Sequence, residues 1–187
     1  MRIVGGAFKG RVLKGPSGPG LRPTSDRLRE TIFNILAHSY DDCVRDARVI
    51  DLFAGTGALG IEALSRGASF ALFVDDGAEA RSLIRGHVEM LGLGGVSRIF
   101  RRDATKLGEA PPGERFDLAF LDPPYGKGLG ERALIALRDG EWLHDEALAI
   151  IEEAKGEMAE LPGGYAELER RDYGDSQLIL VRHLPTR

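Results

Sequence analysis

One short stretch of the sequence, Leu121-Asp122-Pro123-Pro124-Tyr125, combines residue types that could hold a flat amine. It follows an apolar, aromatic-rich run over 116–120 that is typical of a buried strand. Two consecutive prolines cannot continue a strand or enter a helix interior, so the backbone must leave the sheet at Asp122 in a stiff turn. That turn offers a carboxylate, backbone carbonyls and an aromatic ring, which could bind an NH2 group and one face of a ring. The structural alternative is a tight turn with a buried tyrosine.

Three strands predicted earlier in the sequence also carry an acidic residue within the strand or at its end. Asp51 lies inside a strand predicted over 49–53, Asp75 ends the next, and Asp103-Ala104 ends a third. In a parallel sheet the ligand binds at the carboxyl ends of the strands. Asp75 could therefore accept hydrogen bonds from both ribose hydroxyls of an adenosine, and Asp103 could read an adenine amino group. At each position, an ordinary acid at a strand end is the alternative.

A glycine-rich segment follows the first of these strands and opens a helix. Gly55-Thr56-Gly57-Ala58-Leu59-Gly60 has the G-x-G-x-x-G spacing that lets a cofactor approach the backbone. Alone it could equally serve a nicotinamide dinucleotide. Asp51 would place a negative charge near the phosphates of such a cofactor, whereas it would favour the ammonium group of a sulfonium cofactor. A dehydrogenase also has no need of a Pro-Pro turn.

The elements that must position these residues alternate from residue 48 onward. Strands are predicted over 49–53, 70–74, 98–100, 116–121 and 147–152, with helices over 57–65, 78–91 and 130–138. Such alternation predicts an α/β fold with a parallel sheet covered on both faces. Two final strands, over 165–171 and 177–183, are predicted to form an antiparallel hairpin at the sheet edge.

The first 45 residues differ from the rest in charge. Residues 1–30 carry a net charge of +5, and the remainder carries −9. Residues 2–14 are predicted to form a short hairpin or extended arm, and a helix capped by Thr24 or Ser25 should pack one face on the body. We therefore expect residues 1–45 to be a basic extension for a polyanionic partner, and residues 46–187 to form the main domain.

Bulk composition excludes several classes of protein. The chain has 187 residues, of which 43% are hydrophobic and 29% charged, as in ordinary globular proteins. The single Cys43 rules out an internal disulfide framework and a multi-cysteine metal site, and is best explained as a small buried hydrophobe. No apolar run is long enough for a membrane span, and no signal-peptide region follows Met1. We expect a cytoplasmic monomer without metal.

Taken together, the motifs resemble a known family. Residues 51–57 with Asp122-Pro123-Pro124-Tyr125 resemble S-adenosylmethionine-dependent methyltransferases that modify exocyclic amines of nucleic-acid bases, on a Rossmann-like class I sheet. The N-terminal segments 1–6, 9–11, 21–24 and 29–34 and Arg27, with Tyr173-Gly174-Asp175, resemble the bacterial 16S rRNA (guanine(966)-N2)-methyltransferases. Asp75, where the family usually has Glu, and His87, where Asn is common, depart from its pattern; we assign His87 no role.

The resemblance implies a site and a mechanism. Asp122 and the carbonyl of Pro123 would each accept one N–H of a guanine 2-amino group, turning the nitrogen lone pair toward the methyl sulfonium. Pro124 would keep the turn rigid, and Tyr125 would stack on the extruded base. The implied partner is 16S rRNA within the small ribosomal subunit. The residues implied to bind the cofactor S-adenosyl-L-methionine are Asp51, Phe53, Gly55, Thr56, Gly57, Asp75, Asp103 and Ala104; those implied to grip RNA phosphates are Lys9, Arg11, Arg22, Arg27 and Arg29.

Three rival functions remain open at this stage. A DNA adenine-N6 or cytosine-N4 methyltransferase could use the same turn, although about 45 appended residues leave little room for a target-recognition region. A non-catalytic nucleic-acid-binding module is the second rival. The intact Asp122-Pro123-Pro124-Tyr125 turn argues against it, because binding alone does not require a site for an amine. A dehydrogenase is the third.

Overall fold

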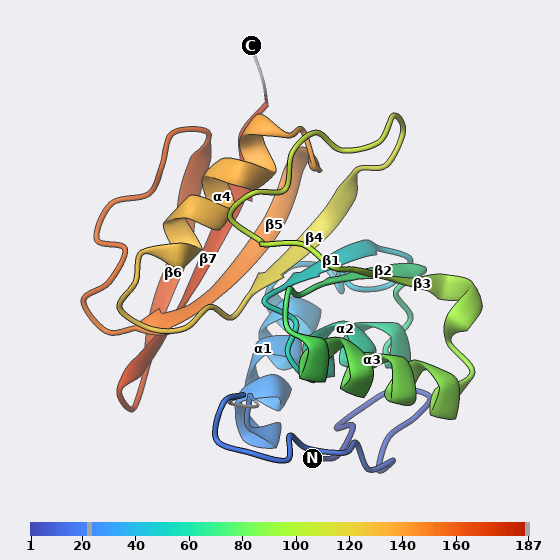
Figure 1. The fold of residues 1–187 in the computed structure, drawn as a ribbon. Coiled ribbons are helices and arrows are strands. Elements are labelled where there is room, and N and C mark those ends of the chain that lie inside the picture. Colours follow the sequence, from blue (N-terminus) through green and yellow to red (C-terminus); the bar gives the residue numbers. More distant parts are fainter. Residues whose placement is uncertain (22–23, 186–187) are drawn as a thin grey trace.

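A single sheet of seven strands, in the order β3-β2-β1-β4-β5-β7-β6, organises the computed structural model, which describes residues 1–21 and 24–185 (Figure 1). The strands are β1 (Arg48–Leu52), β2 (Phe70–Val74), β3 (Ser97–Phe100), β4 (Phe116–Leu121), β5 (Leu143–Ala154), β6 (Tyr165–Tyr173) and β7 (Ser176–His183). Strands β1 to β5 pair in parallel, and β7 pairs antiparallel with both β5 and β6. The predicted mostly parallel α/β sheet with a closing antiparallel hairpin is confirmed.

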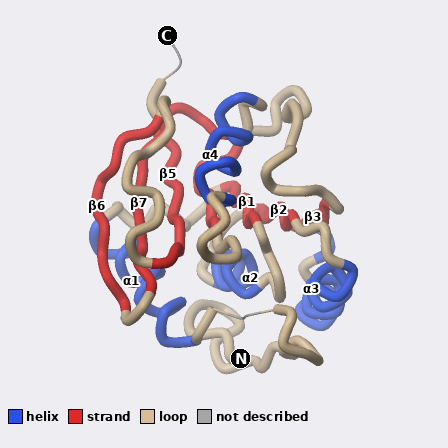
Figure 2. Tube along the Cα trace, turned by 60° about the vertical axis from the view of Figure 1, so that its left-hand side comes forward, coloured by secondary structure: helices blue, strands red, loops and turns tan. Residues whose placement is uncertain are grey.

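Helices cover both faces of this sheet. Helices α1 (Asp26–Ser39), α2 (Ala58–Ser65) and α3 (Ala78–Leu91) lie on one face, and α4 (Leu129–Asp139) lies on the other (Figures 1 and 2). A short 3-10 helix, η1 (Gly94–Val96), precedes β3. Alternate residues of a strand enter opposite cores: Leu118 and Phe120 pack with α1, whereas Ala119 and Leu121 pack with α4. This is why the central strands read as continuous apolar runs.

The direction of the chain crossovers reverses at β1. The chain passes from β1 outward to β2 and β3, and then returns to β4 on the other side of β1. At such a reversal the loops that follow neighbouring strands diverge and leave a crevice at the carboxyl edge of the sheet. The glycine-rich segment after β1 and the Pro-Pro turn after β4 both start there.

The N-terminal segment is tied to α2. The predicted hairpin or extended arm folds back on itself around an antiparallel bridge between Arg2 and Val12, with backbone hydrogen bonds on either side of that bridge. The buried carboxylate of Glu62 accepts hydrogen bonds from the backbone N–H groups of Val4 and Gly5, both at 2.9 Å. Gly6 passes so close to α2 that an added Cβ would lie 1.9 Å from the Ser65 carbonyl oxygen. The arm is thus clamped to the body before α1 begins.

The structure defines the start of α1 and the start of β5 more precisely than the sequence did. Ser25 is the N-cap of α1, since its hydroxyl accepts the Leu28 N–H at 3.1 Å, which leaves Thr24 for another role. Strand β5 begins at Leu143 instead of 147, with a register shift opposite Phe116 and Leu118. Within the described part of the chain, none of the helices has both the length and the apolar character that a membrane crossing needs.

Candidate active site at the carboxyl edge of the sheet

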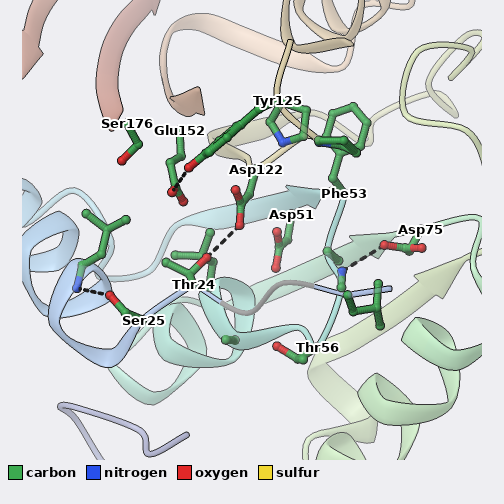
Figure 3. A pocket seen from close by; sticks show the side chains of 18 of the residues that line it. Thr24, Ser25, Asp51, Phe53, Thr56, Asp75, Asp122, Tyr125, Glu152 and Ser176 are labelled. Atoms are coloured by element: carbon green, nitrogen blue, oxygen red, sulfur yellow. Dashed lines mark hydrogen bonds between the residues drawn. The ribbon is translucent and has the colours of Figure 1, made fainter. Parts of the chain in front are cut away.

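A cavity of about 1030 Å³ opens at the carboxyl edge, between the loops after β1, β2 and β4 (Figure 3). It is large enough for a nucleoside-sized ligand and part of a second molecule. The polar residues that line it come from six separate stretches of chain: Thr24, Ser25, Arg27, Thr31, Asp51, Thr56, Asp75, Asp76, Asp122, Tyr125, Glu152, Tyr173 and Ser176. Five of these are carboxylates, and Arg27 is the only base among the lining residues that the structure describes. The cavity therefore suits a cationic ligand better than a pyrophosphate.

The cofactor side of the cavity is held by backbone groups. Asp75 Oδ2 accepts the Gly55 N–H at 2.9 Å, and its Oδ1 accepts the Gly77 N–H at 2.8 Å (Figure 3). One carboxylate thus fixes the loops after β1 and β2 and still has lone pairs for a ligand. His87, for which the sequence indicated no role, lies with Nδ1 2.9 Å from the Thr56 carbonyl oxygen and supports the same loop from α3.

Asp51 is buried beneath the glycine loop. Its Oδ2 accepts the Gly60 N–H at 3.0 Å, and only 1% of the residue is exposed. Gly60 must be glycine because an added Cβ would lie 2.5 Å from the Phe73 ring. Burial raises the pKa of Asp51 to about 8, with a smaller contribution from the nearby carboxylate of Asp75. A cation bound in the cavity would restore the charge of Asp51.

Phe53 begins the loop in a left-handed conformation. Its φ is 55°, which is uncommon for a residue other than glycine, and its side chain projects from β1 toward the Pro-Pro turn (Figure 3). Phe53, Gly55 and Thr56 all line the cavity, while Gly57 caps α2 just behind it. The predicted cofactor residues of this loop are therefore gathered in one place.

The Pro-Pro turn forms the opposite wall. Pro123 is buried, whereas Pro124 is exposed and Asp122 and Tyr125 are half-buried. Asp122 Oδ2 accepts the Thr24 hydroxyl at 2.7 Å, and the Tyr125 hydroxyl donates to Glu152 Oε1 at 2.7 Å (Figure 3). In this half of the cavity, side-chain hydroxyls from distant segments hold the carboxylates.

Glu152 is the acid of this wall that sequence reasoning missed. It is 8% exposed and stands on β5, directly beside the Pro-Pro turn. Burial raises the pKa of Asp122 well above its usual range, and the carboxyl group of Glu152 raises it further. A sequence signal existed, because Glu152 follows the apolar run of its strand just as Asp75 and Asp122 follow theirs.

Two predicted cofactor residues lie outside the cavity lining. Ala104 is buried in the core shared with α4, and Asp103 Oδ1 accepts the N–H and the hydroxyl of Thr105 at 2.8 and 2.7 Å. Those hydrogen bonds lower the pKa of Asp103. A contact between Asp103 and an adenine therefore stays a prediction.

The predicted phosphate-binding residues separate into two groups. Lys9, Arg11 and Arg27 are exposed, and Arg27 also lines the cavity. Arg29 is fully buried: its Nη2 donates to the Arg2 carbonyl oxygen at 2.7 Å and to Asp26. The prediction that Arg29 contacts a phosphate is therefore wrong, because its buried guanidinium holds α1 to the N-terminal segment. Arg22 lies outside the described residues.

Three lining residues carry hydroxyl or aromatic groups that sequence reasoning did not place in the site. Thr24 was interpreted only as a possible helix cap, and Tyr173 and Ser176 belong to the β6–β7 turn, which reaches the cavity from the far end of the chain. The described residues contain no cluster of three or more histidine, cysteine or acidic side chains that could hold a metal ion.

Comparison with known proteins places the chain among relatives of similar length. Residues 1–182 match the protein family described as Conserved hypothetical protein 95. The chain is 40% identical over 168 residues to Ribosomal RNA small subunit methyltransferase D of Escherichia coli strain K12, covering 89% of this chain and 81% of the relative. The enzyme of the same name from Haemophilus influenzae is 31% identical over 176 residues, covering 93% and 89%. The solved structure of Escherichia coli yhhF superposes with a TM-score of 0.84 at 31% identity, covering 100% of this chain and 99% of that one.

Proposed function

The chain belongs to the Conserved hypothetical protein 95 family of rRNA methyltransferases, and from this premise we propose that it methylates the exocyclic N2 amine of a guanine in 16S rRNA of the small ribosomal subunit, using S-adenosyl-L-methionine. The observation that carries the proposal is the position of Asp122. Its carboxylate faces the same cavity as Asp75 and the glycine loop, so an amine and a cofactor can meet there.

The residues of the cavity fit this cofactor. S-adenosylmethionine carries a positively charged sulfonium, which supplies the methyl group, and an ammonium group. Asp76 gives the cavity negative charge, Asp51 can ionise when such a cation binds, and Asp75 offers acceptors for ribose hydroxyls at the end of β2. A pyrophosphate would be repelled by the same acids, which argues against a dinucleotide dehydrogenase.

The chain's contribution to the reaction is alignment and proton handling. The lone pair of an aromatic amine is delocalised, so Asp122 and the Pro123 carbonyl must each accept an N–H to turn that lone pair toward the methyl group. Methyl transfer from the sulfonium would leave the amine nitrogen positively charged, so the amine would have to release one proton. Asp122 is suited to take this proton, because burial and Glu152 raise the pKa of its carboxyl well above the usual range.

The basic N-terminal surface gives the site its substrate class. Lys9 and Arg11 are exposed on the arm, and Arg27 stands at the cavity on α1. Arg27 at the cavity and the exposed cations of the arm, which packs against the far end of α2 at Ser65, would grip phosphates around an extruded base and bring it to Asp122. We expect this binding in the cytoplasm, where small subunits assemble, with no membrane and no metal involved.

Product analysis tests the proposal directly. The purified chain is incubated with labelled S-adenosylmethionine and, in parallel, with unmethylated small subunits, naked 16S rRNA or duplex DNA. Digestion and mass spectrometry should find N2-methylguanosine in rRNA. N6-methyladenine or N4-methylcytosine in DNA would favour the DNA-methyltransferase alternative, and no methylated product would contradict an enzyme.

The phosphate contacts have their own test. A Lys9→Gln, Arg11→Gln, Arg27→Gln variant should raise KM for the small subunit and flatten its dependence on salt, because fewer counterions are released on binding. Lys127→Gln, on the exposed loop after the Pro-Pro turn, is a matched control that should change the salt slope less. An unchanged slope in the triple variant would show that the N-terminal surface does not touch RNA.

A further inference from the structure

We propose that Glu152 is a second base-reading residue, whose carboxylate accepts the ring N1–H of the target guanine while Asp122 accepts an N–H of its 2-amino group. The inference rests on the proposed function, because it concerns the same base in the same cavity. It adds a residue that determines which base is accepted.

Strand register places the two carboxylates side by side. Leu121 of β4 is the parallel partner of Ile151 of β5, so Asp122 and Glu152 are the next residues on adjacent strands. Their side chains point into the cavity from the same face of the sheet (Figure 3). Adjacent parallel strands lie about 4.8 Å apart, so the two side chains can converge on the edge of a single base.

Asp122 and Glu152 need hydrogen-bond donors because they lie so close together. Like charges at such short range repel, and burial strengthens the repulsion. The Thr24 hydroxyl donates to Asp122, and the Tyr125 hydroxyl donates to Glu152. Asp122 and Glu152 also hydrogen-bond to each other, but each ionised carboxylate offers about four acceptor lone pairs, so both acids can still accept more. A ligand edge with two adjacent N–H donors would satisfy the pair.

Guanine has that edge, and the other amine-bearing bases do not. Its ring N1–H and 2-amino group stand next to each other, and both are donors. Adenine and cytosine instead place an unprotonated ring nitrogen beside the amine, and its lone pair would face a carboxylate. A site whose buried acceptors are left unpaired rejects the wrong substrate strongly. With Asp122 alone the site could bind any of the amine-bearing bases, and Glu152 would make it selective for guanine.

A purely structural role for Glu152 would be to position Tyr125. Glu152→Gln separates the two roles, because the amide oxygen can still accept the Tyr125 hydroxyl while the other acceptor oxygen becomes an NH2 donor. That donor would clash with N1–H of guanine. Tyr125→Phe is the converse variant: it removes the hydroxyl and keeps both carboxylates.

The experiment uses small subunits reconstituted with either guanine or 2-aminopurine at the target position. 2-Aminopurine keeps the 2-amino group but has a bare N1 lone pair. For the wild-type chain we expect kcat/KM to be about 10- to 100-fold lower on 2-aminopurine, the loss expected for one charge-assisted hydrogen bond. Glu152→Gln should lower kcat/KM on guanine by a similar factor and lose or reverse the preference. Tyr125→Phe should keep the preference.

Matched controls exclude damage to the fold. Glu153→Gln removes the neighbouring buried carboxylate of β5 on the opposite face of the sheet; its amide oxygen can still accept the Gly126 N–H behind the Pro-Pro turn, so kcat/KM should stay within about twofold. The melting temperature and S-adenosylhomocysteine affinity of Glu152→Gln should match those of the wild type. If the wild type forms N2-methylguanosine and Glu152→Gln forms it equally fast with the same preference, the inference is overturned alone. If the wild type forms none, the proposed function fails, and the inference fails with it.

Discussion

The two halves of the cavity hold their acids in different ways. On the cofactor side, Asp51 and Asp75 accept hydrogen bonds from backbone N–H groups of the glycine loop and its neighbour. On the base side, Asp122 and Glu152 are held by the hydroxyls of Thr24 and Tyr125. Backbone groups move only if the loop moves, whereas a hydroxyl can rotate away at little cost.

This difference matches what each half is proposed to bind. A cofactor of constant shape is best served by a preformed site, because no ordering is then required on binding. An extruded base must displace or share existing contacts when it enters, and rotatable hydroxyls permit this. The comparison predicts that substitutions on the cofactor side change affinity, while those on the base side change turnover.

Asp122→Ala is expected to have the largest effect. It removes the proposed acceptor that would align the amine and receive its proton, so kcat should fall by about 100- to 1000-fold, as for loss of a central electrostatic contact. The affinity for S-adenosylhomocysteine, measured by calorimetry, should stay within a few-fold of the wild type. Turnover at the wild-type rate would contradict the mechanism, and lost cofactor binding would contradict the division into two halves.

Asp75→Ala should show the opposite pattern. It removes the ribose acceptor and the contacts to the N–H groups of Gly55 and Gly77, so the dissociation constant for S-adenosylhomocysteine should rise about 10- to 100-fold. At saturating cofactor, kcat should change far less. Asp76→Ala removes an adjacent exposed carboxylate of the same cavity and should weaken binding less. Equal losses in the two variants would mean that charge alone matters.

The two halves also differ in how far the sequence reveals them. Asp51, the glycine loop and Asp75 lie within 25 residues, and local strand–turn–helix patterns predict their meeting. Asp122, Glu152 and Ser176 meet only because β4, β5 and β7 are neighbours in the sheet, and Thr24 joins them because α1 packs on that sheet. Local periodicity does not reveal the order of strands in a sheet. The Pro-Pro turn could therefore be predicted from the sequence, but the residues that meet it could not.

Burial is the second quantity that local patterns hide. Arg29 sits in a basic, helix-opening segment and looks like a phosphate ligand, yet its side chain faces Arg2 and Glu62. Asp103 stands at a strand end like the other acids, yet it turns back onto Thr105. In both cases the sequence indicated the charge correctly but not the direction of the side chain, which tertiary packing decides.

Asp51 gives a prediction based on pH. Its pKa is about 8 in the folded chain against an ordinary value of 3.8, so between these values the folded state holds a proton that the unfolded chain has lost. Raising the pH through this window should therefore lower the free energy of unfolding of the ligand-free protein, and Asp51→Asn should flatten that dependence. Urea titrations from pH 5 to pH 8.5 would measure both slopes.

The same linkage acts on cofactor binding. S-adenosylhomocysteine lacks the sulfonium but keeps the ammonium group, which favours ionised Asp51, so its binding at pH 7 should release up to one proton, and affinity should increase as the pH rises toward 8. Calorimetry in buffers of different ionisation enthalpy counts the protons. Asp51→Asn should release almost none and bind several-fold more weakly. Equal proton release in the variant would assign the proton to another group.

Thr24→Val should have the smallest effect, and it tests whether a hydroxyl on the base side merely fills space. The substitution keeps the volume and removes the donor to Asp122 Oδ2, so kcat should fall about 3- to 10-fold, the value of one hydrogen bond, with cofactor affinity unchanged. The Thr24 hydroxyl also lowers the pKa of Asp122 against the opposing effects of burial and Glu152. Without it the pKa should rise, and because Asp122 must be ionised to accept the amine, the acidic limb of the kcat–pH profile should move to higher pH.

Thr24→Ser is the matched control, since it restores the hydroxyl on a smaller side chain and should restore both kcat and the pH profile. A Thr24→Val variant that is faster than the wild type would mean that the hydroxyl competes with the amine for Asp122. A variant with lowered kcat but an unshifted profile would make Thr24 a packing residue. Only a shifted acidic limb that serine reverses would show that the segment leading into α1 tunes the carboxylate after β4, and so couples the N-terminal extension to the proposed chemistry.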